Sequence, residues 1–433
     1  MEILQEIFFH SMMEVLMPEI HARARPLIFS HVCGHWRQVV LSTPALWARV
    51  VVQIQFRYRP SYTSIVNLWL ERSHSFPLDL YLLDSRCTIS RLNPDPVLEL
   101  LLAHAHRWHT ISWCLQDGDS AEQFLENSIG AGHENLLESL DISILRCKGD
   151  QSERFPLALQ PFSHLRRLSY SSNTSQCLLN LPFTHLTHLK LQCPIPVDVC
   201  GRILSQCLTV VNVSIRDIIA PLDEICRTHL FLPELRSLDL YSSWGDLGLL
   251  LGQLNCPNLH ILGLRCGGSQ HSHVKAYETF LLRSGCHLLK FTFYDNWLPE
   301  GYLVRLLAIS CLKSLQNLEV ACYNLSDCTI NLLTQREVLP RLKRLEIWYC
   351  CSSDGKLADM IASRWRKRPS SPRYTLTWCS LGLNFSVPPG KRLYHCDDEE
   401  EQKAILSAHK KDMKRFRSFT ADGLELHWNL NTH

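Results

Sequence analysis

The sequence lacks the features that would place the chain in a membrane, on a nucleic acid or outside the cell. No apolar run reaches the ~18 residues that span a bilayer. The 433 residues carry 44 basic and 42 acidic side chains, and a net charge of +2 gives no electrostatic reason to expect a nucleic-acid partner. Residues 1–20 contain no Lys or Arg, so the positive start of a secretory signal is missing. We expect a cytoplasmic or nuclear protein without membrane or nucleic-acid partners.

The sequence also lacks the motifs of known catalytic sites. Neither a Gly-x4-Gly-Lys-Ser/Thr phosphate loop nor a Gly-x-Ser-x-Gly nucleophile elbow occurs. His133-Glu134 is not followed by the second histidine of a zinc protease helix. Histidines stand close together at His104, His106 and His109, but Cys or His partners at zinc-site spacing are missing. We therefore expect no catalytic residue, no metal and no cofactor.

Nineteen cysteines are many for one chain, but their pattern does not describe a disulfide framework. Their number is odd, and their spacing is irregular. Together with the missing secretory start, this predicts free, reduced thiols in an intracellular protein. Cys207, Cys256, Cys286 and Cys311 stand just before a repeat begins, where small apolar residues pack.

What the sequence does contain is a repeat. The pattern apolar-x-x-apolar-x-apolar returns ten times, for example in Leu165-Arg-Arg-Leu168-Ser-Tyr170. The repeats start at Trp108, Leu137, Leu165, Leu186, Leu208, Leu235, Leu259, Leu288, Leu315 and Leu342. Their intervals of 21 to 29 residues lie in the leucine-rich-repeat range, although the trailing Asn or Cys is poorly kept. Such units bury their leucines by stacking, which predicts an irregular solenoid with a curved parallel sheet and helices on its convex side.

Segments between and after the strands show apolar residues at helical spacing. The helices expected from this spacing cover 65–72, 95–106, 197–206, 222–229, 273–284, 302–310 and 327–338. Alternation predicts strands over 78–83, taken as the first of the sheet, and over 374–378 and 424–428.

Two charged segments stand near the end of the chain. A helix expected over 397–416 has acidic residues at its start and Lys410, Lys411, Lys414 and Arg415 at its end, as the helix dipole favours. The basic run 364–368 fits either a nuclear signal or a solvated helix end.

Three pieces precede the repeats, and together they carry a resemblance. Residues 2–8 read Glu-Ile-Leu-Gln-Glu-Ile-Phe with helical spacing, and residues 27–40 form a second apolar helical segment. Thr43-Pro44 predicts a short third helix with Thr as its N-cap. In residues and order the pieces resemble the F-box of fungal, basidiomycete-type F-box proteins with leucine-rich repeats. In that family the F-box is a three-helix unit that docks a Skp-type adaptor, which in turn binds a cullin in an SCF ubiquitin ligase.

The resemblance implies a set of adaptor-binding residues. These are Ile3, Leu4, Ile7, Phe8, Val32, Cys33, Trp36 and Trp47, of which the first four would form the docking surface and the others would shape the fold or the contact. The family usually opens with Leu-Pro, and Met1 stands in its place here. Two explanations stay open, an N-terminally truncated form or weakened docking. The alternative without the resemblance is an apolar cap over the first repeat.

The expected architecture is α/β with four parts. An F-box-like helical domain with a truncated start covers 1–52, and a linker with the first strand and helix covers 53–107. The leucine-rich-repeat solenoid covers 108–380, and a capping helix and strand cover 381–433.

The outward side chains of the repeat strands give a candidate partner site. Side chains alternate along a strand, so the residues beside the inward leucines point to the concave face. One outward column holds Tyr241, Arg265, Tyr294 and Trp348, with Ala321 as a gap. Tyr, Arg and Trp are enriched at binding hot spots, so we hypothesise that this column binds the partner. The alternatives are that large residues cover the strand ends, or that the C-terminal segment packs there.

These observations favour a substrate-recognition subunit of an SCF-type ubiquitin ligase. The F-box would dock a Skp-type adaptor and, through it, a cullin, while the repeats would bind an unknown target protein. The alternative is a leucine-rich-repeat scaffold that binds a protein without recruiting a ligase. In both cases the chain supplies proximity and orientation and performs no chemistry.

Overall fold

The computed structural model describes residues 2–13, 25–54, 60–84, 96–115, 125–128, 136–145, 155–175, 178–222, 229–267, 274–295, 297–365, 376–383, 403 and 405–430. They form an α/β fold with two compact units, residues 1–194 and 195–433, whose boundary falls within strand β6. Fourteen strands are hydrogen-bonded in parallel ladders in chain order, β1 to β6 before that boundary and β7, β9 and β11 to β16 after it.

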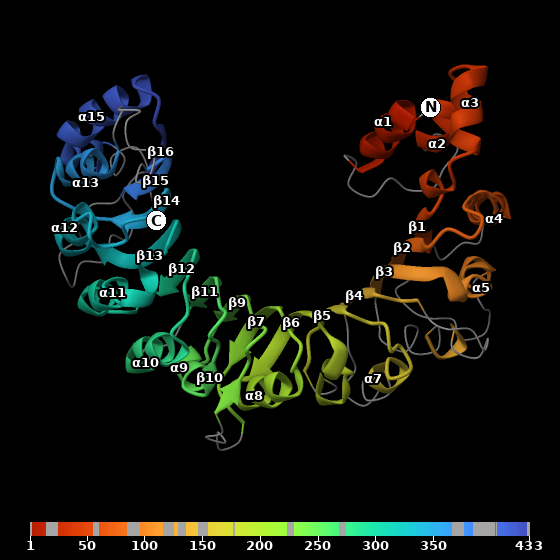
Figure 1. Cartoon of the computed structure of the whole chain (residues 1–433), viewed down its shortest axis with the longest axis horizontal. Helices are drawn as coiled ribbons and strands as arrows, with labels where there is room; N and C mark the ends of the chain where they lie inside the picture. The colour runs from red at the N-terminus through yellow and green to blue at the C-terminus, as the bar shows by residue number, and fades with distance from the viewer. Residues whose placement is uncertain are drawn as a thin grey trace. The chain divides into compact units, whose positions relative to one another are not determined.

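The first unit begins with helices and continues as a strand ladder (Figure 1). Its helices are α1 (Glu2–Met13), α2 (Arg25–Ser30), α3 (Gly34–Leu41), η1 (Pro44–Leu46), α4 (Pro60–Arg72), α5 (Pro96–Leu102), η2 (Ala105–Arg107), α7 (Phe155–Ala158), η3 (Leu178–Asn180) and η4 (Phe183–His185). Its strands are β1 (Arg49–Ile54), β2 (Leu78–Asp84), β3 (Trp108–Leu115), β4 (Ser139–Ile144), β5 (Arg167–Ser171) and β6 (His188–Pro196).

The second unit repeats a strand–helix unit with greater regularity. Its strands are β7 (Asn212–Ile219), β9 (Ser237–Ser242), β11 (Ile261–Cys266), β12 (Lys290–Asp295), β13 (Asn317–Leu325), β14 (Arg344–Cys350), β15 (Trp378–Leu383) and β16 (Glu425–Leu430), with a separate short pair β8 (Leu230–Phe231) and β10 (Leu254–Asn255). Its helices are α8 (Val197–Gln206), α9 (Leu247–Leu251), α10 (Val274–Ser284), α11 (Glu300–Leu307), η5 (Ser310–Leu312), α12 (Asp327–Thr334), α13 (Lys356–Arg364) and α15 (Lys410–Ala421). Within this unit successive α-helices contact one another along one side of the ladder (Figure 1).

The repeat pattern predicts the core of the second unit. The inward positions Leu238, Leu240, Leu262, Leu264, Phe291, Phe293, Leu318, Val320, Leu345 and Ile347 are all at most 2% exposed. Burying one such side chain stabilises a fold by about 1.5–3 kcal/mol, so these rows hold each strand against the helices.

The predicted start of one repeat, at Leu208, is wrong by two residues. Asn212 pairs with Ser237, which makes Val210 the equivalent of Leu235 and shifts the predicted start at Leu208 by two residues. Leu208 is 64% exposed, whereas Val210 is 1% exposed. Two apolar triplets overlap here, and the one that ends at Ile215 buries more apolar surface.

The first strand of the sheet also differs from the prediction. The segment 78–83 is the second strand, because β1 pairs with it from Arg49 opposite Asp79 to Ile54 opposite Asp84. The run Arg-Val-Val-Val-Gln-Ile is rich in β-branched residues, which favours a strand. The ladder therefore begins inside the segment that the sequence assigned to the helical domain.

The N-terminal helices are divided differently from the predicted pattern. The segment 27–40 is two helices, because the chain turns at residues 31–33 and Cys33 caps α3 by accepting a hydrogen bond from the Trp36 amide at 3.4 Å. Pro44 starts a 3-10 turn, but the Thr43 hydroxyl does not cap it. That hydroxyl donates to the Val39 carbonyl at 2.7 Å and accepts from the Gln5 side chain at 3.0 Å, which ties α1 to α3.

Other helices follow the predictions closely, with exceptions near the end. The helices expected over 65–72, 197–206 and 273–284 are confirmed as α4, α8 and α10. Of the helix expected over 222–229, residues 223–228 lie outside the described residues, as do residues 374–375 of the predicted strand, which begins at Trp378. Helix α15 begins at Lys410, so Lys410 and Lys411 stand in its first turn and the predicted placement of these two residues at a helix end is wrong, whereas the acidic residues 397–401 lie outside the described residues.

Acidic side chains at helix starts link consecutive repeats. Glu300, the first residue of α11, accepts from the Ser326 amide at 2.9 Å and from the Thr329 amide at 3.0 Å at the start of α12. Asp327, the first residue of α12, accepts from the Ser353 amide at 2.7 Å ahead of α13. Each carboxylate thus satisfies amide groups that the next repeat leaves unpaired.

Helices α13 and α15 cap one another. Asp354 precedes α13 and accepts from the Lys411 and Asp412 amides at 2.8 and 3.1 Å, at the start of α15. Asp412, fully buried in α15, accepts from the Ala358 amide in α13 at 2.8 Å. The C-terminal helix is therefore fixed to the last repeat by backbone groups of both elements.

Candidate protein-binding surfaces

The N-terminal helices α1 to α3 expose large apolar side chains. Ile3 is 78% exposed, Ile7 55% and Val32 56%, and Phe9, Ile28 and Leu41 are also exposed. Ile3 and Ile7 are four residues apart on α1 and form one stripe on its surface. Exposed apolar side chains of this size, grouped in one short segment, are typical of an interaction surface.

The predicted adaptor-binding residues fall into three groups by exposure. Ile3, Ile7, Val32 and Cys33 are exposed, and Leu4 and Trp36 are half-buried. Phe8 and Trp47 are 1% and 0% exposed, so neither offers side-chain surface to a partner in this structure, and a docking role for Phe8 stays a prediction.

Phe8 and Trp47 instead hold the helices together and to the ladder. The Phe8 ring stacks on Phe29 with centroids 4.6 Å apart and meets the edge of Trp36 at 4.9 Å. Trp47 meets Trp69 of α4 edge-on at 4.9 Å, and its indole N–H donates to the Val40 carbonyl at 2.9 Å. Aromatic pairs prefer these offset and edge-to-face arrangements.

A second candidate surface is the outward face of β9 to β14. Tyr241 pairs in register with Arg265, Arg265 with Tyr294, Tyr294 with Ala321, and Ala321 with Trp348. The structure therefore places the predicted column in a single row across five strands. Tyr241 is 37% exposed, and the other three large residues are half-buried.

Arg265 in this row forms an ion pair with Asp239 on the neighbouring strand β9, above the position of Gly263. The Arg265 guanidinium contacts the Asp239 carboxylate at 2.5 Å, with both side chains 29% exposed. Gly263 lies opposite Asp239 in register, and a Cβ atom there would come within 2.2 Å of the carboxylate. The missing side chain of Gly263 gives the pair its space.

The ion pair continues into a hydrogen-bonded group around Glu319. The Arg265 guanidinium lies 5.3 Å from the centre of the Tyr294 ring, a cation–π contact. The Tyr294 hydroxyl donates to Glu319, and the Thr292 hydroxyl donates to the same carboxylate at 3.0 Å. Burial, followed by this contact with Glu319, raises the pKa of Tyr294, so the phenol remains a donor.

Glu346 stands next to Glu319 in register on β14. Burial and the neighbouring charge of Glu319 raise the pKa of Glu346 above its ordinary value. Trp348 stands two residues after Glu346 on the same face of β14 and acts on Glu346 in the direction that lowers its pKa. Directly after Trp348, Tyr349 has a positive φ of 59° and the pairing of β14 with β15 shifts. Such bulges redirect the side chains beside them.

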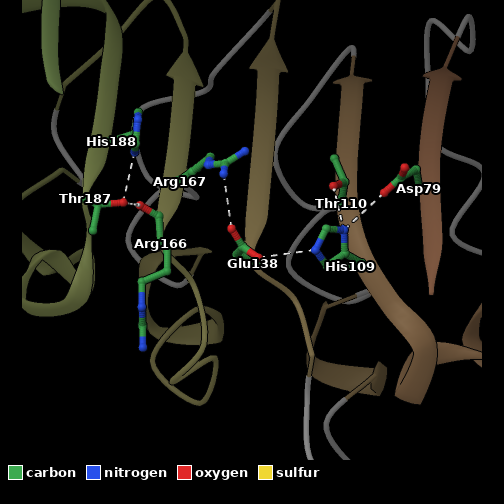
Figure 2. A network of polar contacts seen from close by, with 8 residues as sticks. All are labelled: Asp79, His109, Thr110, Glu138, Arg166, Arg167, Thr187 and His188. Carbon is green, nitrogen blue, oxygen red and sulfur yellow. Dashed lines mark hydrogen bonds and ion pairs between the residues drawn. The ribbon is translucent and has the colours of Figure 1, made fainter. Parts of the chain in front are cut away.

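A third group of polar contacts lies in the first unit, where Figure 2 shows side chains in the neighbouring strands β2 to β6 or directly before them. His109 contacts Asp79 at 3.3 Å through Nδ1 and Glu138 at 3.3 Å through Nε2. Glu138 also pairs with Arg167 at 3.3 Å. These side chains are 39–57% exposed, and exposed ion pairs contribute only about 0–1 kcal/mol each.

Near this group, burial, followed by the charge of Arg167, lowers the pKa of His188. The Thr187 hydroxyl contacts His188 Nδ1 at 2.9 Å (Figure 2). In this network around His109 and Glu138 the acidic and basic side chains already pair with one another. It also lacks a row of aromatic side chains like the one from Tyr241 to Trp348. The described residues of the second unit therefore offer the stronger candidate for a partner.

Sequence reasoning missed two exposed tryptophans. Trp244 follows β9 and is 74% exposed, and Trp297 follows β12 and is 53% exposed. A tryptophan in the loop directly after a repeat strand was the available signal.

Most of the cysteines in the described part of the chain are buried. The 14 cysteines described there are free, and burial raises the pKa of Cys207 and of Cys256 to about 12. Within the same residues no group of three or more His, Cys, Asp or Glu side chains is arranged to hold a metal ion. His271 and His273 lie outside the described residues.

No helix among the described residues has the length and apolar character required to cross a bilayer. No protein-family model matches the chain, and no curated protein matches its sequence.

Proposed function

We propose that the chain is a non-catalytic receptor subunit that joins an adaptor to a target protein, as in an SCF-type ubiquitin ligase. The N-terminal helices α1 to α3 dock a Skp-type adaptor and, through it, a cullin. The outward face of β9 to β14 holds the target. The observation that carries the proposal is the exposed apolar surface of Ile3, Ile7 and Val32 on a helical unit with its own aromatic core.

The packing of the helices supports a surface that is formed before the partner binds. Phe8, Phe29 and Trp36 fix the helices against each other, so Ile3 and Ile7 are presented on an ordered support. Trp47 contacts both α3 of this unit and α4, and so joins the unit to α4. A surface that is already ordered loses less conformational entropy when it binds.

Co-purification with a purified Skp-type adaptor tests the proposal. The unmodified chain should retain the adaptor through size-exclusion chromatography. The variant Ile3→Glu/Ile7→Glu should lose it, because two charges would enter the apolar contact. Leu157→Glu is the matched control, since Leu157 is 59% exposed on α7 and lies outside the helical unit. A folded chain that does not bind the adaptor would instead be a scaffold without ligase recruitment.

A further inference from the structure

Aromatic side chains gather at the carboxyl edge of the strands in the second unit. Tyr241, Tyr294 and Trp348 occupy equivalent positions near the ends of β9, β12 and β14. Trp244 and Trp297 rise from the loops that follow β9 and β12. Because the carboxyl ends of neighbouring parallel strands meet at one edge of a sheet, both loops border the row.

The loop that carries Trp297 is held by the buried side chain of Asp295 at the end of β12. The Trp297 and Leu298 amides donate to one Asp295 oxygen at 2.9 and 3.1 Å. Asp295 is 1% exposed, so this turn is anchored in the core.

The loop that carries Trp244 is held in a similar way. The Ser242 hydroxyl donates to the Ile218 carbonyl at 2.8 Å and accepts from the Gly245 amide at 2.7 Å. A Cβ on Gly245 would lie 2.6 Å from the Ile219 carbonyl oxygen, so this loop packs tightly on the preceding repeat. Both tryptophans are thus exposed on ordered loops, the arrangement that gives binding anchors a low ordering cost.

Next to the aromatic row stand two carboxylates, Glu319 and Glu346. Lys290 and Arg344 act electrostatically on Glu346, in the direction that lowers its pKa. Glu319 accepts from the neutral hydroxyls of Tyr294 and Thr292, and Glu346 stands beside Trp348 on the same face of β14. Within the described residues neither carboxylate forms an ion pair, in contrast to Asp239 with Arg265. Two half-buried acids side by side repel each other, and a cation placed between them relieves the repulsion.

The chemistry of the row selects the kind of partner. Lysine and arginine side chains bind carboxylates and also the faces of Tyr and Trp rings. A phosphate backbone or an anionic lipid would be repelled by the same two acids. The row crosses five neighbouring strands that lie about 4.8 Å apart, so it is about 19 Å long, which is the length of about six residues of an extended chain.

We propose that Tyr294, Trp297, Trp348, Glu319 and Glu346 bind an extended segment of a partner protein that carries a lysine or arginine side chain. The cationic group sits at the Glu319–Glu346 pair, with the aromatic rings against its apolar stem. This inference deepens the proposed function, on which it rests, because it assigns the chemistry of the target segment.

Phage-displayed random linear dodecapeptides, selected on the full chain, test this inference. Selected peptides should contain Lys or Arg, and fluorescence anisotropy should show at least a tenfold higher Kd when that residue is replaced by Ala. Glu319→Gln/Glu346→Gln should raise the Kd by a similar factor, because Gln still accepts the hydrogen bonds but carries no charge. Trp297→Ala should raise it about fivefold or more.

The control variant is Leu282→Ala, which removes a 58% exposed apolar side chain from α10 and should leave the Kd unchanged. Selected peptides without a basic residue, or a Kd unaffected by the double Gln variant, would overturn the inference.

Adaptor co-purification and peptide binding, both measured on the unmodified chain, separate the two proposals. A chain that binds the adaptor but no basic peptide refutes only the inference about the target segment. A chain that binds basic peptides but not the adaptor supports that inference and refutes the ligase role.

Discussion

The guanidinium of Arg265 reaches diagonally across the sheet to the carboxylate of Asp239, and it passes over Gly263 to do so. The arginine also lies against Tyr294, which donates to Glu319. Gly263 therefore makes room for the Asp239–Arg265 ion pair. From this pair, contacts continue through Tyr294 to Glu319, so that they join the strands β9, β11, β12 and β13.

Replacing Gly263 by Ala should disturb these contacts. The added Cβ would clash with the Asp239 carboxylate, so we expect a loss of about 1–3 kcal/mol in the free energy of unfolding, measured by urea denaturation. Gly301→Ala is the control. Gly301 lies in α11 with no atom near its Cβ position, and the substitution should stabilise the chain by about 0.5–1 kcal/mol. Equal effects of the two substitutions would contradict the steric role of Gly263.

Replacing Glu300 by Gln should weaken the link between α11 and α12. Burial opposes ionisation of Glu300, but the hydrogen bonds from Ser326 and Thr329 outweigh it and lower the pKa. The stabilisation is therefore fully present above the ordinary value of 4.5 and is lost as the pH falls through the lower folded value. At pH 7 we expect a loss of about 1–3 kcal/mol, and the difference from the unmodified chain should shrink in denaturation curves recorded toward pH 3.

Arg364 has a structural role that the sequence did not indicate. The basic run suggested a nuclear signal or a solvated helix end, but Arg364 is 6% exposed. Its guanidinium donates to the carbonyls of Leu333, Gln335, Val338 and Leu339. Burial, with the charge of Arg336, lowers its pKa to about 10.

We therefore expect Arg364→Lys to lower the free energy of unfolding by about 1–3 kcal/mol, because one ammonium group cannot satisfy four carbonyls. Thermal denaturation followed by circular dichroism measures this loss. Arg417→Lys, on the exposed side of α15, should change it by less than about 0.5 kcal/mol. A melting curve for Arg364→Lys that matches the unmodified chain would rule out this role.

The affinity for a selected basic peptide should depend on pH through Glu346. Burial and Glu319 raise its pKa, while Lys290 and Arg344 oppose this rise. The Kd should therefore begin to increase, on acidification, at a pH above the ordinary glutamate value of 4.5. Protonation of Glu346 also stabilises the free chain, so weaker binding and greater stability should occur together. In Glu346→Gln this pH dependence of the Kd should be reduced.

Thiol alkylation should report on adaptor docking. Among the described cysteines Cys33 and Cys328 are exposed, so iodoacetamide should modify them first, as measured by mass spectrometry. Cys207 and Cys256, buried and with a pKa of about 12, should react slowly. A bound adaptor should protect Cys33 and leave Cys328 reactive. Equal protection of both would indicate a change in the whole fold instead of a local contact.

The sequence predicted the elements that depend on periodic burial. The inward leucines and the row from Tyr241 to Trp348 follow from the period of a strand, and the register agrees with them. The predicted start of the repeat at Leu208 was wrong because two overlapping sets of three apolar residues fit the same pattern. The burial of Phe8 was not predicted, because helical spacing does not show which of two apolar neighbours faces the core.

The polar contacts of the candidate site could not be predicted from the sequence. The Asp239–Arg265 pair joins residues 26 positions apart, and it depends on the absence of a side chain at Gly263. The buried role of Arg364 depends on carbonyl groups, which no residue pattern reveals. Local periodicity carries information about burial, whereas these contacts depend on the register of neighbouring strands and on loop paths.

The carboxylates of Glu300 and Asp327 each belong to one repeat, while their amide donors belong to the next. A repeat that opens alone would leave a charged group of its neighbour without its donors. The segment from α11 to α13 should consequently unfold as one cooperative block, with similar amide-exchange protection throughout. Such a block keeps Glu319 and Glu346 in a constant geometry between binding events.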